Sequence, residues 1–314
     1  MRYGLPYKGS KNKIAKWIVD QLPEVEVFAD LFFGGGAVTH RAMLTGKYKR
    51  FIVNDIDERL PKLFVDCAYG KYTVENHPEW VTREEFNARK KDDAYIALVW
   101  SFGNNGKDYM YGADIEKYKK ALHFACYYND LSLLDELGIH IEKSREKAVY
   151  DRYKDFAKQI GNKKHNMLES FTRLQAVERL QSLQSLQSLQ SLQSFGTDYQ
   201  NVPLPEGAVI YCDIPYKSTN CGKYQGFDHE RFYSWAVKQD NIYISEYDMP
   251  EDFIRIASIK KQVLSAANTN SKSTMESIFT NRKTYESMTD AQRMKLHYED
   301  AKQLTIFDMI NRGV

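Results

Sequence analysis

The sequence has few cysteines, and their spacing matches no metal site or redox motif. The four are Cys67, Cys126, Cys212 and Cys221; they form no CxxC pair, and the seven histidines form no metal-binding pattern with them. This usage argues against a zinc site and favours a reducing compartment. We therefore expect no metal cofactor.

Long apolar runs and a strong excess of one charge are also missing. No apolar run approaches the roughly 18 residues that cross a bilayer, and the first residues lead directly into polar sequence. We therefore expect a soluble, cytoplasmic protein with no membrane partner. Lys and Arg number 44 against 42 Asp and Glu, a net charge of +2. Composition alone therefore does not indicate a nucleic-acid partner, and local clusters must do so.

The most informative stretch is 209–216, which reads VIYCDIPY. A short apolar run that ends on an acid, a proline and a tyrosine predicts a buried strand that delivers polar groups to a sheet edge, where open α/β sheets place their chemistry. The tetrapeptide Asp213, Ile214, Pro215 and Tyr216 resembles the Asp-Pro-Pro-Tyr signature of methyltransferases that use S-adenosylmethionine (AdoMet) to methylate an amino group of a base. The alternative is a strand that ends in an ordinary turn.

These residue types suit an adenine amino group, whose lone pair is delocalised into the ring. The Asp213 carboxylate can accept one amino hydrogen, the carbonyl of Ile214 can accept the other, and the Tyr216 ring can stack on the base. Ile214 stands where the signature has its first proline. Since Ile214 precedes Pro215, it is still biased to extended geometry, and we expect activity to survive with less rigidity.

The N-terminal part carries the pattern of a nucleoside-binding fold. A glycine-containing loop, 6–11, precedes an amphipathic helix, 12–22, and a strand, 25–30. Consecutive glycines then open a helix, and a second strand, 50–53, ends at Asn54 and Asp55. Glycines let the backbone approach a ligand, and an acid about twenty residues later is placed to bind a ribose.

Together these segments resemble the Dam-type (D12 class) N6-adenine DNA methyltransferases, in the motif order of that family. The resemblance implies double-stranded DNA as partner and AdoMet as co-substrate. The implied AdoMet contacts are Tyr7, Lys11, Asp30, Phe32 and Gly34, with Asp55 on the ribose hydroxyls and Asp198 near the adenine of AdoMet. Asp30 and Leu31 stand where many members have Glu-Pro, which keeps the acid and loosens the turn.

Residues 58–175 differ in character, and we take them as a mainly helical target-recognition insertion. The loop 101–112 is rich in glycine, asparagine and aromatics and resembles the family's Phe-Asn-Gly loop near DNA; amides can pair with adenine edges and aromatics can wedge beside a displaced base. The stretch 143–164 is locally basic, and its charges are suited to phosphates. A polar surface loop and a solvated helix face are the alternatives.

Five copies of Leu-Gln-Ser cover 180–194. On an α-helix, leucines every three residues rotate by about 60° per repeat and make no single buried stripe. We interpret the repeat as a helical spacer that enters a strand near 192–195.

The C-terminal part predicts a hairpin and a tail. The segments 262–266 and 277–281 flank the turn-rich stretch 268–273, as the terminal antiparallel pair of an AdoMet-dependent methyltransferase would. In the tail, 303–307 (QLTIF) resembles the pentapeptide by which bacterial proteins bind the DNA sliding clamp. Gln303 and Phe307 would be anchors of such a contact, and a helix packed on the core is the alternative.

The sequence therefore predicts a Rossmann-like, mostly parallel α/β sheet with an antiparallel terminal hairpin. The expected catalytic domain consists of 1–57 and 190–285. Between its two parts lie the insertion 58–175 and the repeat spacer 176–189, and the tail 286–314 follows. The expected activity is site-specific methylation of adenine N6 in DNA, in a bacterial or phage-type, nucleoid-associated protein. Two alternatives remain. The protein could methylate another amino group, such as cytosine N4 or a protein glutamine, or it could be a catalytically silent relative that binds DNA or associates with the clamp.

Overall fold

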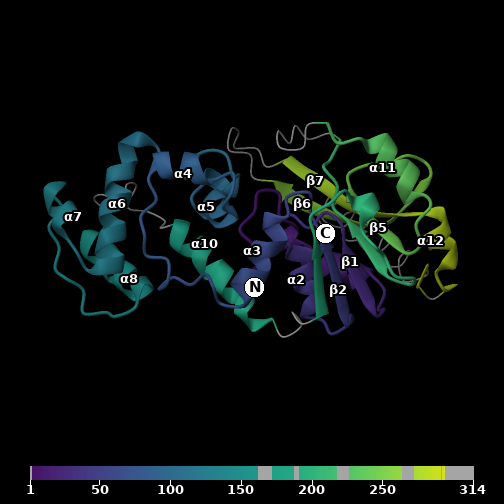
Figure 1. The fold of residues 1–314 in the computed structure, drawn as a ribbon, viewed down its shortest axis with the longest axis horizontal. Coiled ribbons are helices and arrows are strands. Elements are labelled where there is room, and N and C mark those ends of the chain that lie inside the picture. The colour runs from purple at the N-terminus through teal and green to yellow at the C-terminus, as the bar shows by residue number, and fades with distance from the viewer. Residues whose placement is uncertain are drawn as a thin grey trace, which may run out of the picture. The chain divides into compact units, whose positions relative to one another are not determined.

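A computed structural model of the chain describes residues 2–161, 172–186, 191–217, 226–263, 272–290 and 292–293. The chain forms two compact units, and each of them is built from three separate stretches (Figure 1). The helical unit comprises Met1–Asn12, Gly34–His40 and Arg59–Leu189. The sheet unit comprises Lys13–Phe33, Arg41–Glu58 and Gln190–Val314.

The sheet unit contains a seven-stranded sheet in the order β3-β2-β1-β4-β5-β7-β6. The strands are β1 (Val27–Asp30), β2 (Arg50–Asn54), β3 (Leu192–Phe195), β4 (Val209–Cys212), β5 (Ile242–Glu246), β6 (Phe253–Val263) and β7 (Lys272–Asn281). Strands β1 to β5 pair in parallel, and β7 is antiparallel to both β5 and β6. The predicted Rossmann-like sheet with an antiparallel terminal pair is confirmed.

Buried apolar runs form the central strands. Every residue of β1, β4 and β5 is buried. Parallel strands covered on both faces carry such continuous runs in place of alternation. Their side chains, among them Ala29, Ile210 and Ile244, form one apolar cluster with Phe232 and Ala236 of α11 (His229–Ala236).

The remaining helices of the sheet unit are short, and the terminal strands are longer than expected. The predicted helix over 12–22 is split at Ile14 into η1 (Lys11–Lys13) and α1 (Ala15–Gln21). The other helices are α2 (Ala37–Met43), which like η1 includes residues of both units, η6 (Tyr199–Asn201) and α12 (Arg282–Ser287). Strands β6 and β7 pair from Phe253 opposite Asn281 to Val263 opposite Lys272, with a register shift after Arg255. The predicted turn 268–273 lies mostly outside the described residues.

The helical unit is mainly helical, as predicted for the insertion. Its helices are α3 (Arg59–Ala68), α4 (Arg83–Arg89), α5 (Ala94–Val99), η2 (Phe102–Asn104), α6 (Ala113–Tyr128), α7 (Ser132–Glu136), α8 (Val149–Ile160), α10 (Thr172–Gln181) and η4 (Ser182–Ser185). Local caps define their starts: Thr82 and Glu85 form a reciprocal capping box at α4, and the Asp93 side chain caps α5. Helix α10 packs against α3 and α5.

The Leu-Gln-Ser repeat adopts two conformations. Its first copies complete α10 and form the 3₁₀ helix η4, and its last copy lies in β3. Leu180, Leu183 and Leu186 are all buried. Leu180 lies in α10, Leu183 in η4, and Leu186 just after η4 in an extended conformation. Residues i and i+3 eclipse each other in a 3₁₀ helix, which has three residues per turn, so the leucines do not advance around the axis here as they would in one continuous α-helix. The expectation that the leucines would spiral without a buried stripe is therefore wrong for these copies, because it assumed α-helical geometry throughout.

Candidate functional site

Three acids follow or end neighbouring parallel strands of the sheet unit. Asp30 is the last residue of β1, where it lies opposite Val53 of β2 and Tyr211 of β4. Asp55 follows β2, and Asp213 follows β4. Parallel strands have their carboxyl ends at one edge, so the three acids lie at the same edge of the sheet. The sheet's order departs there from the order along the chain, which is where open α/β sheets bind ligands.

Asn54 ties the segments of this edge together. Its side-chain amide donates to the carbonyls of Leu31 (3.1 Å) and Thr197 (3.0 Å). Its side-chain oxygen accepts from the N–H of Thr197 (3.1 Å), and its backbone carbonyl accepts from Phe33 (2.9 Å). This role of Asn54 was not predicted from the sequence, although an amide at a strand end can serve two loops at once.

The segment 213–216 is held by contacts from two other elements. His229 of α11 donates its Nε2 hydrogen to the carbonyl of Pro215 (2.8 Å), and the hydroxyl of Tyr216 donates to Glu276 of β7. The ring of Tyr216 meets that of Tyr247 edge to face, with centroids 4.6 Å apart. The Ile214 side chain is buried in the apolar cluster of the sheet. The predicted catalytic segment thus has a fixed backbone.

Another buried acid, Glu246, is the last residue of β5. Burial raises the pKa of Glu246 to about 7; hydrogen bonds from the backbone N–H groups of Tyr247 and Lys217 oppose this, and the charges of Asp213 and Glu276 add to it. Since Lys217 directly follows Tyr216, Glu246 also fixes the end of the predicted catalytic segment. An acid that ends a predicted strand is a signal that could have revealed Glu246.

No comparable sequence signal marks the other acid, Glu276. It lies inside β7, where it is buried, although its sequence neighbours resemble those of an ordinary strand. Burial first, and then the charges of Asp213 and Glu276, raise the pKa of Tyr216 well above its ordinary value. Tyr216 therefore stays protonated and donates to Glu276.

Two predicted AdoMet contacts of the sheet unit are engaged in packing or pairing. The half-buried Phe32 ring lies among aromatic rings, with centroids 5.3 Å from Tyr199 and 5.7 Å from Phe227. The Asp198 carboxylate accepts from the N–H of Gln200 (3.0 Å) and pairs with Arg231 (2.9 Å). The roles of both residues toward AdoMet stay predictions.

The helical unit contains the glycine turn and the N-terminal loop, which lie against each other. The N–H of Leu5 donates to the carbonyl of Gly35 (2.7 Å). Gly4 has a φ of +68°, and a Cβ there would collide with the Gly35 carbonyl. The Tyr7 ring lies 3.3 Å from where a Cβ on Gly34 would be. The structure therefore brings Tyr7 and Gly34 together, as the cofactor prediction requires of these two, and it buries Lys11.

A comparison with family models matches residues 7–242 to the D12 class N6 adenine-specific DNA methyltransferases. The chain belongs to this family. The match spans both the strand that precedes the glycine turn and the segment 213–216. No curated protein matches the chain.

In this member of the family the loop 101–112 has a fixed base and an exposed tip. Tyr109 and Tyr111 are buried, and the Tyr109 hydroxyl donates to the carbonyl of Val81 (2.7 Å). Asn104 donates to the carbonyl of Leu98 (2.8 Å), and its own carbonyl accepts from the N–H of Lys8 (3.3 Å). The Phe102 ring, by contrast, is 68% exposed. The tyrosines therefore stabilise the loop, and Phe102 is the aromatic that can reach a partner.

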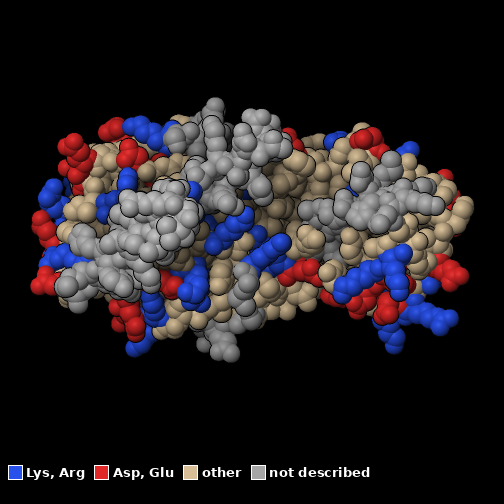
Figure 2. All heavy atoms as spheres, turned by 180° about the vertical axis from the view of Figure 1, so that it is seen from behind, with Lys and Arg blue, Asp and Glu red and all other residues tan. Residues whose placement is uncertain are grey.

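The predicted basic stretch of the methyltransferase, 143–164, contains both structural and exposed cations. Arg152 donates to the backbone carbonyls of Cys126 and Tyr127 at the end of α6. The exposed cations are Lys143, Arg145, Lys147, Lys154 and Lys158, whereas Lys163 and Lys164 lie outside the described residues. Acidic and basic side chains are interspersed on the face that Figure 2 shows, in keeping with the net charge of +2.

Within the described part of the chain, no group of three or more His, Cys, Asp or Glu side chains is placed to hold a metal ion. None of the helices described there is long and apolar enough to cross a membrane. The pentapeptide 303–307 lies outside the described residues, so the clamp contact of Gln303 and Phe307 stays a prediction.

Proposed function

We propose that this protein transfers a methyl group from AdoMet to N6 of adenine in DNA, with the adenine flipped out of the duplex. The observation that carries the proposal is the position of Asp213 at the sheet edge it shares with Asp30 and Asp55. Membership in an adenine-methylating DNA enzyme family supports the choice of substrate and reaction.

The acids present fit AdoMet as the co-substrate. Asp30 and Asp55 are both buried, and a carboxylate can accept hydrogen bonds from the ammonium group of a methionyl chain or from ribose hydroxyls. We assign Asp55 to the ribose and Asp30 and Phe32 to the rest of the molecule, with Tyr7, Lys11 and Gly34 as contacts from the glycine turn and N-terminal loop. AdoMet, when bound, supplies an electrophilic methyl group on its sulfonium.

The residues of the segment 213–216 then act on the adenine. The Asp213 carboxylate accepts one amino hydrogen and the Ile214 carbonyl accepts the other, which localises the nitrogen lone pair for attack. The Tyr216 ring stacks on the base while its hydroxyl is held by Glu276. The proton of the alkylated nitrogen leaves to solvent, so Asp213 need not be a strong base. Fixing this segment through His229 and Glu246 reduces the reorganisation needed at the moment of reaction.

We assign target recognition to the insertion 58–175, with Phe102 as the exposed aromatic of its loop. Because the substrate is DNA, we place the protein in the compartment that holds DNA. The resemblance of 303–307 to a clamp-binding peptide is the basis for proposing the sliding clamp as a second partner.

The proposed reaction is tested with labelled AdoMet and duplex DNA of mixed sequence, followed by identification of the methylated base. We expect N6-methyladenine with the native chain and a loss of at least a hundredfold in kcat for Asp213→Asn, because an oriented hydrogen-bond acceptor contributes on this scale. The matched control is Asp252→Asn, the same change at an exposed turn. Two results would overturn the assignment: label found in cytosine, or label found in protein while DNA remains unlabelled.

A further inference from the structure

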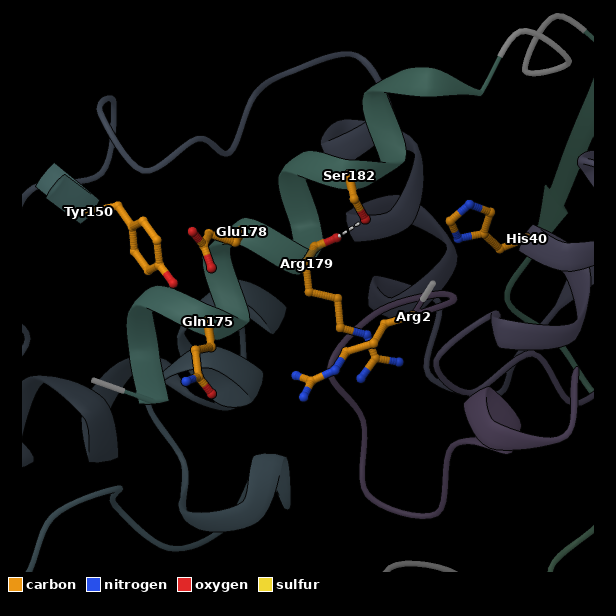
Figure 3. Close-up of a pocket in the computed structure, with 7 residues that line it drawn as sticks. All are labelled: Arg2, His40, Tyr150, Gln175, Glu178, Arg179 and Ser182. Atoms are coloured by element: carbon orange, nitrogen blue, oxygen red, sulfur yellow. Dashed lines mark hydrogen bonds between the residues drawn. The ribbon is translucent and has the colours of Figure 1, made fainter. Parts of the chain in front are cut away.

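A pocket of about 370 Å³ lies in the helical unit (Figure 3). Its walls come from the N-terminal segment, α2, α8 and α10, which supply Arg2, His40, Tyr150 and Arg179 respectively. Gln175, Glu178 and Ser182 complete the lining. No role assigned so far uses this pocket.

Among the described residues, the two guanidinium groups in the pocket have no counterion. Arg179 donates through Nε to the carbonyl of Gly4 (2.9 Å) and through one Nη to the carbonyl of Tyr3, and these acceptors are neutral. Neither Arg2 nor Arg179 pairs with a carboxylate among the residues that the structure describes. Burial lowers the pKa of Arg179 to about 10, and the nearby charge of Arg2 adds to this effect. An anion between them would relieve this repulsion.

His40 lines the pocket as a neutral side chain. The N–H of Gly4 donates to His40 Nδ1 (2.9 Å), so the proton of the neutral imidazole must be on Nε2. Burial, followed by the charge of Arg179, lowers the pKa of His40 to about 4 and keeps the ring neutral. His40 is 2% exposed, and its Nε2 is buried without a hydrogen-bond partner in the part of the chain that the structure describes. The neutral ring therefore adds no positive charge to the cationic end, which consists of the two guanidinium groups.

The one acidic side chain in the lining leaves this cationic end open. Figure 3 shows Glu178 directed toward Tyr150, while the guanidinium groups of Arg2 and Arg179 lie together. Burial raises the pKa of Glu178, and the charge of Lys154 opposes this. The pocket therefore has an acidic side and a separate cationic side, and only the latter suits an anion.

We propose that Arg2 and Arg179 bind a backbone phosphate of the DNA substrate in this pocket. The proposal rests on the proposed function, because it takes DNA as the substrate. Phosphates accept half or more of the hydrogen bonds in protein–DNA complexes, and the planar fork of arginine matches their geometry. Arg179 also holds the carbonyls of Tyr3 and Gly4, next to Leu5, whose N–H donates to Gly35, so the bound phosphate and this N-terminal segment share one guanidinium.

The test compares Arg2→Ala with the matched control Arg282→Ala, an exposed arginine at the start of α12. The dissociation constant for a duplex of arbitrary sequence is measured between about 50 and 200 mM salt, where counterion release dominates. We expect Arg2→Ala to weaken binding about tenfold at low salt and to reduce the slope of log K against log salt by about one. Arg282→Ala keeps the native slope, and the affinity for AdoMet is unchanged in both variants.

Each other outcome has a distinct meaning. If the native chain binds duplex DNA and Arg2→Ala keeps its slope, the phosphate site is rejected. If the native chain binds no duplex at all, the proposed function itself fails. If inorganic phosphate raises the unfolding temperature of the native chain but not of Arg2→Ala, while the two have the same DNA slope, the occupant is a free phosphate, and the DNA assignment is overturned.

Discussion

Arg179 holds the backbone of Gly4 although the two residues are 175 positions apart in the chain. The guanidinium comes from α10, directly before the Leu-Gln-Ser repeat, and the carbonyl of Gly4 belongs to the N-terminal segment that packs on the glycine turn. The repeat-bearing helix is thereby connected to the backbone that the family resemblance assigns to AdoMet.

Arg179→Met should therefore affect both stability and cofactor binding. Loss of hydrogen bonds from a charged group to two carbonyls lowers the free energy of unfolding by about 1.5–3 kcal/mol. The freed N-terminal segment no longer holds the glycine turn, so we expect about tenfold weaker AdoMet binding by calorimetry. Arg179→Lys keeps the positive charge but loses the planar guanidinium, so its stability and its AdoMet affinity should lie between those of Arg179→Met and the native chain. A stability loss with native AdoMet affinity would mean that Arg179 does not position the turn.

The hydroxyl and the ring of Tyr216 should have separable roles. Tyr216→Phe removes the hydrogen bond to the buried Glu276 and should cost about 1–3 kcal/mol in urea unfolding, with kcat/KM for DNA close to native. Tyr216→Ala also removes the stacking surface, worth about 1–3 kcal/mol per base, and should lower kcat/KM by roughly ten- to a hundredfold. Equal kcat/KM values for the two variants would argue against stacking.

Ile214 should contribute packing through its side chain and chemistry through its carbonyl. The side chain is 2% exposed in the sheet's apolar cluster. Ile214→Val should lower the free energy of unfolding by about 0.5–1.5 kcal/mol and Ile214→Ala by about 2–5 kcal/mol. Both variants keep the carbonyl, so we expect kcat within a few-fold of native at a temperature where each is folded. A hundredfold fall in kcat for Ile214→Val would contradict this division.

Glu246 should make the protein less stable as the pH rises from about 4.5 to about 7. Its pKa is near 7 in the folded state and near 4.5 when unfolded, so the folded state binds the proton more tightly in this window. Stability from this group is greatest below pH 4.5, falls through the window and is constant above it. Glu246→Gln removes the effect and should be more stable than native by about 1–3 kcal/mol at pH 8.

Urea unfolding at pH 5 and pH 8 checks this prediction. The difference between Glu246→Gln and native should grow with pH, whereas the exposed control Glu251→Gln should show no such growth. A constant difference at both pH values would mean that Glu246 is ionised to the same extent in the folded and unfolded states.

The strands and the placement of Asp30, Asp55 and Asp213 were predictable from the sequence, because buried parallel strands require continuous apolar runs and end abruptly at polar residues. The helix over 12–22 was predicted without its break at Ile14, since periodicity does not resolve local tightening. Glu276 and His229 were missed, because their contacts with Tyr216 and Pro215 join segments 60 and 14 residues apart. No local pattern encodes such distant partners.

The order of motifs, the apolar runs and the acids that follow them are properties of the sequence itself, because periodicity and residue chemistry are local. The conformation of the Leu-Gln-Ser repeat is not. Different copies of the same tripeptide lie in the 3₁₀ helix η4 at 182–185 and in the strand β3 at 192–195. In the first place Leu183 is fully buried against the helical unit, and in the second the backbone pairs in parallel with β2. With identical local preferences, only the surface that each copy meets decided its structure.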